Sequence, residues 1–227
     1  MNNIDVISGL STGMMSAIIF NPIDKAIYVS TTKNMSIFNK KPWCDMYKGS
    51  SYTIITRLIT SGLYFTYIDY YSKKTNSNFE IALVTTLCCS ITNPLQLIKF
   101  NSWYNNISTK SSASLILKTH GYKGFAIGIS ALLVRDFVFN YIYLSFKEKD
   151  NHLNNILTIC GGLIAVSPIN VIKNKKYASN ESIRSIIKNF HFSQLGLSYS
   201  LARISVSFYL SQYLYDNNKY YLSNLFK

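Results

Sequence analysis

The sequence predicts an all-α membrane protein, with six transmembrane helices in three pseudo-symmetric two-helix repeats around a central cavity. Three observations lead to this prediction: few charged residues, apolar stretches about 20 residues long, and a repeated spacing of prolines and arginines. Of the 227 residues, 48% are hydrophobic and only 15% are charged, whereas soluble domains usually contain about a quarter charged residues. A helix of about 20 apolar residues is long enough to cross the hydrocarbon core of a bilayer.

Six stretches have the composition of membrane-spanning helices. They are Ile4–Ser30, Ser51–Tyr71, Phe79–Trp103, Gly121–Glu148, Leu153–Ile172 and Leu195–Tyr215. The polar sequences after the first, third and fifth stretches have room for short loop helices. Each stretch is moderately polar, as expected for helices that line a cavity on one face.

The fourth stretch is the most informative, because Arg135 and Asp136 lie in its middle. A charge at bilayer depth costs several kcal/mol, so it is retained only where it faces a cavity or a partner. The alternative is a soluble core helix whose Arg and Asp side chains simply reach the surface. The remaining five apolar stretches favour the membrane interpretation.

The chain repeats itself three times. Three prolines recur 72 and 74 residues apart, and three arginines recur 78 and 68 residues apart: Pro22, Pro94 and Pro168; Arg57, Arg135 and Arg203. The tripeptide Tyr47-Lys48-Gly49 recurs as Tyr122-Lys123-Gly124. A repeat at a fixed period indicates repeated structural units, which we place at residues 1–74, 75–150 and 151–227 of one transmembrane domain. The prolines should kink their helices, and Pro22 should do so near the end of the first.

The net charge of +13 does not indicate nucleic-acid binding. The basic residues lie between the apolar stretches and form no groove with interleaved aromatic residues. More than half of the 23 basic residues fall in or beside the three polar loops within the pairs. This asymmetry sets the orientation of a membrane protein and predicts both termini on the less positive side.

Enzymatic and metal-dependent functions find no support in the sequence. The four cysteines show no CxxC spacing, and most of them lie in apolar stretches, where cysteine acts as a small hydrophobic residue. The three histidines lie in polar segments, and no nucleophile and base are spaced for catalysis. We therefore expect a protein that is not an enzyme and that uses no cofactor and no metal.

The repeated motifs resemble those of the mitochondrial carrier family, whose odd-numbered helices carry P-x-[DE]-x-x-[KR]. The copies here are Pro22-Ile23-Asp24-Lys25-Ala26-Ile27, Pro94-Leu95-Gln96-Leu97-Ile98-Lys99 and Pro168-Ile169-Asn170-Val171-Ile172-Lys173. The sequence that starts at Arg135 is similar to the motif of the family's even-numbered helices, and residues 215–219 match the end of that motif. Repeats of about 73 residues are short for the family, so the loop helices should be reduced. A carrier encoded by a virus or a parasite fits this shortening.

This resemblance implies a solute carrier of the mitochondrial inner membrane that works by alternating access as a monomer. The implied substrate contacts are Arg57, Arg135, Asp136 and Arg203. Three arginines against one aspartate require an anion with carboxylate or phosphate groups. A nucleotide or deoxynucleotide is the favoured substrate. The alternatives are an amino acid or S-adenosylmethionine-like substrate, and a degenerate carrier that acts as a membrane scaffold without transport.

Two gates and a lipid contact complete the expected site. The loop-side gate comprises Asp24, Gln96, Lys99, Asn170 and Lys173, with Asp24 expected to pair with Lys99 and Gln96 with Lys173. The opposite gate comprises Lys73, Glu148, Asp216 and Lys219, and it should be the stronger of the two. An anionic phospholipid such as cardiolipin is expected at Lys48, Gly49, Lys123 and Gly124, although ordinary interfacial anchoring by Tyr and Lys explains the same residues.

Overall fold

The computed structural model describes residues 3–59, 75, 77–146, 152–179, 181–190 and 196–225. These residues are helical or connecting and include no strand, so the all-α prediction is confirmed. The longer helices are α1 (Asn3–Lys33), α4 (Asn78–Cys89), α5 (Asn93–Asn105), α7 (Ile129–Phe146), α8 (His152–Ser179) and α10 (Leu197–Leu225). Residues 50–59 form a further helical segment. The short elements are α2 (Lys40–Trp43), η1 (Ser90–Thr92), α6 (Thr109–His120), η2 (Tyr122–Ala126) and α9 (Ile183–Lys188).

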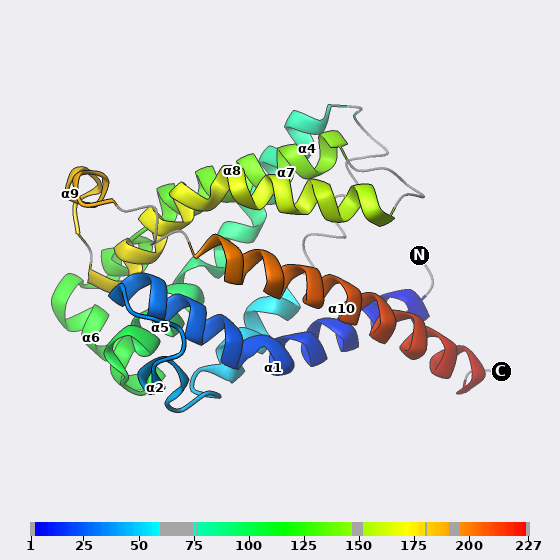
Figure 1. Ribbon diagram of the computed structural model, residues 1–227, viewed down its shortest axis with the longest axis horizontal. Coiled ribbons are helices and arrows are strands. Elements are labelled where there is room, and N and C mark those ends of the chain that lie inside the picture. The colour runs from blue at the N-terminus through cyan, green and yellow to red at the C-terminus, as the bar shows by residue number, and fades with distance from the viewer. Residues whose placement is uncertain are drawn as a thin grey trace.

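The long helices lie side by side in an elongated bundle (Figure 1). Neighbouring contacts run from α1 to α10, from α10 to α8, from α8 to α7 and from α7 to α4. The segment 50–59 joins α1 through a hydrogen bond from Thr53 Oγ1 to Asn21 Oδ1 at 2.7 Å. The loop helices α2, α6 and α9 gather at one end of the long axis, and both chain ends lie at the other (Figure 1). We call the end of the bundle that carries α2, α6 and α9 the loop-helix end.

Three helical stretches among the described residues are long and apolar enough to cross a membrane: Asn78–Asn105, Tyr122–Phe146 and Leu153–Ser179. They coincide with the third, fourth and fifth predicted spans. The helix α1 covers the first predicted span and has sufficient length, but it is not among the three stretches found in the described part of the chain. The second predicted span runs beyond the described residues. The structure is thus all-helical with three candidate spans, and the sixfold crossing remains a prediction.

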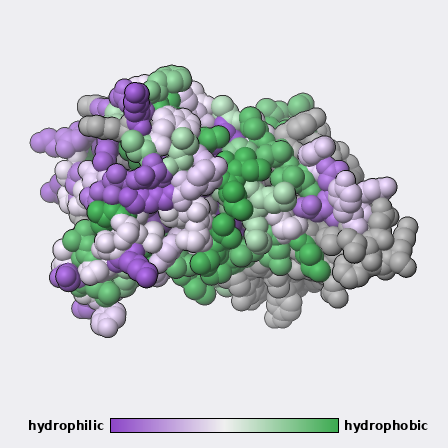
Figure 2. Space-filling model, turned by 90° about the horizontal axis from the view of Figure 1, so that it is seen from below, coloured by the Kyte–Doolittle hydropathy of each residue, from purple (hydrophilic) through white to green (hydrophobic). Residues whose placement is uncertain are grey.

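The candidate spans expose apolar side chains and bury polar ones. Leu87, Ile91 and Leu157 are more than half exposed, whereas Thr85 and Thr86 on α4 are almost completely buried. Figure 2 shows hydrophobic surface gathered across the middle of the molecule, with hydrophilic surface concentrated at the loop-helix end. A large exposed apolar surface around a polar interior is typical of a protein surrounded by lipid.

The three prolines lie differently from one another in their helices. Pro22 lies inside α1, well before the helix ends at Lys33, so the expectation that it lies near the helix end is wrong. Pro94 lies at the start of α5, directly after the 3₁₀ turn η1 that interrupts the helical stretch. Pro168 lies inside α8. A proline lacks the N–H that continues the helical ladder, which explains the change of helix type before Pro94.

The two Asn-Pro steps are anchored in the same way. Asn21 Nδ2 donates to Met46 O at 3.0 Å, and Asn93 Nδ2 donates to Phe125 O at 2.8 Å. Each accepting carbonyl lies next to one of the two Tyr-Lys-Gly tripeptides. Each asparagine oxygen also accepts from a hydroxyl, that of Thr53 or of Tyr177. The asparagines therefore tie both proline-containing helices to the segments that start the next helices.

The proline-containing helices α1, α5 and α8 contact one another at the loop-helix end. The rings of Tyr28 and Phe100 lie 4.5 Å apart between centroids, and Phe100 stacks on Tyr177 at 5.7 Å. Trp103 packs against Tyr28 and Phe100 and donates from Nε1 to Lys48 O at 2.6 Å. We call Tyr28, Phe100, Trp103 and Tyr177 the aromatic cluster. It joins one helix from each predicted repeat.

Candidate functional site

A cavity of about 600 Å³ lies in the bundle and is lined by residues of α1, the segment 50–59, α4, α5, α7, α8 and α10. It contains all nine residues that the sequence assigns to the substrate site and the loop-side gate. These are Asp24, Arg57, Gln96, Lys99, Arg135, Asp136, Asn170, Lys173 and Arg203. Residues up to 179 positions apart in the chain are therefore brought to one space.

Asp24 is the centre of the first charged group in this cavity. Arg203 Nη2 donates a hydrogen bond to Asp24 Oδ2 at 2.9 Å, and Arg203 Nε makes an ion-pair contact with Oδ1 at 2.8 Å. Arg57 Nη2 lies 3.8 Å from the same Oδ2. Arg203 also covers the ring of Phe20 at 5.1 Å. One carboxylate thus faces two guanidinium groups from different helices.

Arg135 and Asp136 form the second charged group. Arg135 Nε donates to Asp136 Oδ1 at 2.7 Å, and Nη2 donates to the same oxygen. Arg135 Nη1 donates to Asn170 Oδ1 at 3.4 Å across to α8. The two adjacent charges partly neutralise each other, and the hydrogen bond to Asn170 holds the Arg135 guanidinium against α8.

Lys99 and Lys173 form the third group, and neither makes the predicted pairing. The Lys99 ammonium lies over Phe100 at 4.5 Å and Trp103 at 4.9 Å. The Lys173 ammonium lies over Phe100 at 5.1 Å and Tyr177 at 5.5 Å. Such cation–π contacts are favourable and stronger when desolvated. Aromatic rings and lysines therefore lie together where α5 and α8 meet.

The predicted pairing of Asp24 with Lys99 is replaced by pairing of Asp24 with Arg203 and Arg57. A guanidinium fork matches a carboxylate better than a single ammonium does. Gln96 likewise donates to Thr92 Oγ1 at 3.1 Å, one helical turn away, and not to a partner on α8.

The opposite gate lies outside the described part of the chain. Lys73 and Glu148 fall in segments that the structure does not describe, and the side chains of Asp216 and Lys219 are not described either. Its pairing therefore stays a prediction.

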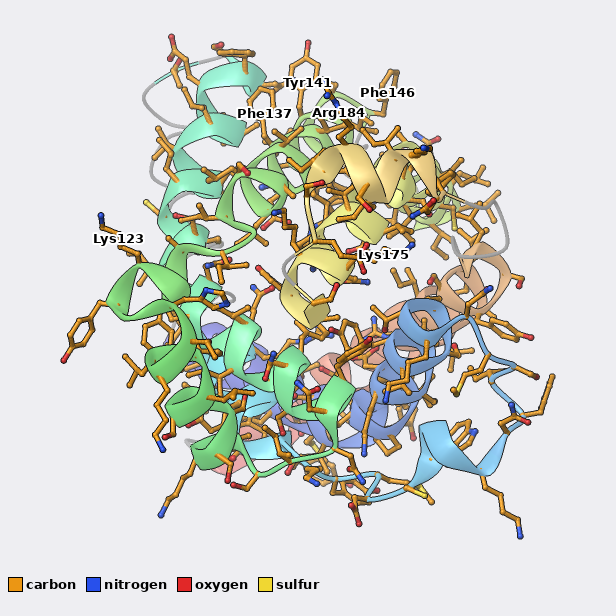
Figure 3. All side chains as sticks on the ribbon, turned by 90° about the vertical axis from the view of Figure 1, so that its left-hand side faces the viewer. Lys123, Phe137, Tyr141, Phe146, Lys175 and Arg184 are labelled. Carbon is orange, nitrogen blue, oxygen red and sulfur yellow. The ribbon has the colours of Figure 1, made fainter. Side chains whose placement is uncertain are left out.

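The predicted lipid contacts lie at the loop-helix end. Lys48 donates to Asn106 O at 2.8 Å and lies 3.6 Å from Asp45 Oδ2, whereas Lys123 is exposed and points outward (Figure 3). Gly49 has φ of +76°, and a Cβ there would lie 3.1 Å from Trp103 Nε1. At Gly124 a Cβ would lie 2.8 Å from His120 Cβ. Backbone conformation and packing account for both glycines without a lipid.

Sequence reasoning missed two features of the cavity. The aromatic cluster has a sequence signal, because Phe100, Trp103 and Tyr177 follow the gate lysines by one or four positions, within a turn of the helix. Asn174 has no comparable signal. Its Oδ1 atom is buried and has no hydrogen-bond partner among the described residues, and the residue lines the cavity. This acceptor is available to a donor on a bound molecule.

The cavity as a whole is positively charged. Among the described lining residues, five basic side chains (Arg57, Lys99, Arg135, Lys173 and Arg203) face two acidic ones (Asp24 and Asp136). In a confined space of low dielectric, this excess attracts anions strongly. The described residues contain no group of three His, Cys, Asp or Glu side chains arranged to hold a metal ion.

No protein-family model matches the chain, and no curated protein matches it.

Proposed function

We propose that the chain is a membrane carrier that exchanges a small anionic metabolite by alternating access, in the manner of mitochondrial carriers. The observation that supports this most is the positively charged cavity, which residues from all the long helices line together. A scaffold would not need partly buried arginines that converge on one cavity. Charges at membrane depth are retained where they serve a pathway.

A nucleotide is the substrate that we favour. Arg57 and Arg203 share one carboxylate, so an incoming phosphate chain can take over the guanidinium groups that Asp24 now engages. The aromatic cluster offers rings on which a base can stack. Asn174 Oδ1 can accept from an exocyclic amino group.

The Arg135–Asp136 pair favours a second candidate, an amino acid or an S-adenosylmethionine-like molecule. Adjacent opposite charges complement a substrate that carries both an ammonium and a carboxylate group. The excess of three positive charges then remains for further acidic groups of the substrate, which is why the nucleotide comes first.

The mitochondrial inner membrane is the location that we propose, on the grounds of the carrier-like motifs. A single subunit contains the whole cavity, so we propose that the protein works as a monomer.

Uptake into liposomes that contain the purified protein tests the function. We expect exchange of radiolabelled nucleotides, and Arg57→Ala, Arg135→Ala and Arg203→Ala should each abolish it. Removing one partner of a buried charge pair costs about 2–5 kcal/mol, which corresponds to a loss of roughly thirtyfold or more in affinity. Asp24→Asn should keep substrate choice and change mainly the rate, because a gate pair only biases the populations of two states.

The matched control is Arg184→Ala, since Arg184 is exposed on α9 at the loop-helix end (Figure 3). It should transport at the wild-type rate. Full activity of a variant that lacks both Arg135 and Arg203 would show that the central site is misplaced and would favour a scaffold without transport.

A further inference from the structure

Lys99 and Lys173 are basic, almost completely buried, and make no ion pair with an acidic residue in the described part of the chain. Their exposed fractions are 8% and 2%, and both line the cavity. The two nearby acids are already engaged, Asp24 by Arg203 and Asp136 by Arg135. A buried charge without a counterion is strongly unfavourable, and cation–π contacts offset only part of that cost.

The positions one turn before the lysines are neutral amides. Gln96 precedes Lys99 by three residues on α5, and Asn170 precedes Lys173 by three residues on α8. Residues at this spacing are neighbours on a helix surface. Acidic side chains there would neutralise the lysines from within the chain, but the amides leave both ammonium groups for an external anion.

The two ammonium groups converge on one ring. Both lysine nitrogens lie within 5.1 Å of the centroid of Phe100, although the lysines come from different helices. A single compact molecule with two negative groups can therefore approach both. The arginines line the same cavity, so a longer anion can engage both sets of cations.

We propose that Lys99 and Lys173 form an anion subsite at the loop-helix end of the cavity, which takes a compact group with two or more negative charges. Diphosphate and dicarboxylate groups share this chemistry. The subsite rests on the proposed function only in its use during transport, since anion binding is measurable without transport. It assigns to these two lysines a role in binding substrate, in addition to their place in the gate.

Thermal unfolding of the full chain in detergent tests the subsite, with sodium pyrophosphate, sodium malonate and sodium chloride compared at equal ionic strength. We expect pyrophosphate or malonate to raise the unfolding midpoint and chloride to leave it unchanged; the more effective anion identifies the source. Lys99→Gln and Lys173→Gln should each weaken the apparent affinity for the effective anion at least tenfold. The control is Lys33→Gln, because Lys33 is exposed and makes a cation–π contact with Tyr104 at 4.8 Å outside the cavity.

Two nearly isosteric variants supply the missing acid. Gln96→Glu and Asn170→Asp place a carboxylate one turn before each lysine, where it competes with the added anion. Both should raise the midpoint of the anion-free protein and weaken anion affinity about tenfold. Asn170→Asp keeps the bond that Arg135 donates, and Gln96→Glu gives up only the donation to Thr92 Oγ1, so these changes keep the test informative if a lysine variant fails to fold.

Lys99→Met separates the subsite from a purely structural role. Removal of an unpaired buried charge should raise the anion-free midpoint and abolish the anion response. A lower midpoint with an intact anion response would show that the lysine only packs on the rings, and would overturn the proposal. If anion binding depends on Lys99 but no substrate is taken up, the subsite is supported and the carrier function is contradicted. If substrate is taken up but Lys99→Gln responds to pyrophosphate and malonate like the wild-type protein, the carrier function is supported and the subsite is contradicted.

Discussion

At the scale of single residues, Asp24 determines how Arg57 and Arg203 are held. Its carboxylate contacts Arg203 and Arg57, and the Asp24 side chain is 28% exposed. This exposure leaves Asp24 accessible from the cavity. An entering anion therefore meets arginines whose present partner is a carboxylate that can be displaced.

We expect Asp24→Asn to lower the unfolding midpoint of the empty protein. Truncating one partner of a buried charge pair costs about 2–5 kcal/mol, and the exposure of Asp24 places this case at the lower end. The measurement is a double-mutant cycle with Arg203→Gln, in which the coupling energy isolates the pair. Asp45→Asn is the control, since Asp45 is 61% exposed and its contact with Lys48 is worth about 0–1 kcal/mol. Additive effects of the two cavity changes would contradict the pairing.

Asn93 is the second residue on which stability should depend. It is completely buried, donates to Phe125 O and accepts from the Tyr177 hydroxyl at 2.6 Å. Asn93→Ala leaves both partners unsatisfied, at about 1–3 kcal/mol for each buried group. Asn93→Ala should therefore lower the unfolding midpoint. The control is Asn105→Ala, which changes an exposed asparagine. Equal midpoints for the two variants would show that the buried bonds contribute nothing.

At the scale of elements, the Tyr-Lys-Gly segments start the next helices in two places, but their lysines differ. Lys48 is held by Asn106 and Asp45, whereas Lys123 on η2 is exposed at the edge of the loop-helix end, whose face also carries Lys175 of α8 and Arg184 of α9 (Figure 3). The exposed lysine is the one that is available to a lipid headgroup.

Added cardiolipin should raise the unfolding midpoint in detergent, because exposed basic residues attract anionic headgroups. Lys123→Ala should reduce that gain without lowering the midpoint in the absence of lipid. Lys48→Ala should lower the midpoint with and without lipid, since it breaks the bonds to Asn106. A midpoint that is indifferent to cardiolipin in the unmodified protein would refute the lipid contact.

At the scale of the whole molecule, the two ends of the described chain lie together, opposite the loop helices (Figure 1). The basic residues concentrate at the loop-helix end, which the positive-inside rule keeps on one side of the membrane. Cysteines introduced at Asn2 and Asn224 should therefore react with an impermeant reagent from the same face of a sealed vesicle. Labelling of the two positions from opposite faces would rule out an even number of crossings.

The sequence predicted the helical class, three of the spans and the residues of the cavity, because these follow from composition and repeated spacing. It did not predict the partners within the cavity. Asp24 and Lys99 occupy motif positions that suggest a pair, yet the choice between Lys99 and Arg203 depends on how α1, α5 and α10 are turned toward one another. The role of Phe100 was equally hidden, since an aromatic residue in an apolar stretch indicates only burial.

The contact between α1 and α10 also has a consequence for how the chain is assembled. Asp24 and Arg203 are 179 positions apart, and Asn218 Nδ2 donates to Ser11 Oγ at 3.0 Å farther along the same pair of helices. The ribosome therefore makes the carboxylate long before the guanidinium that holds it, and α1 lacks this partner while the intervening helices are synthesised. The contact between α1 and α10 consequently forms only after α10 has been synthesised, so the early helices must remain soluble in the membrane or be protected until then.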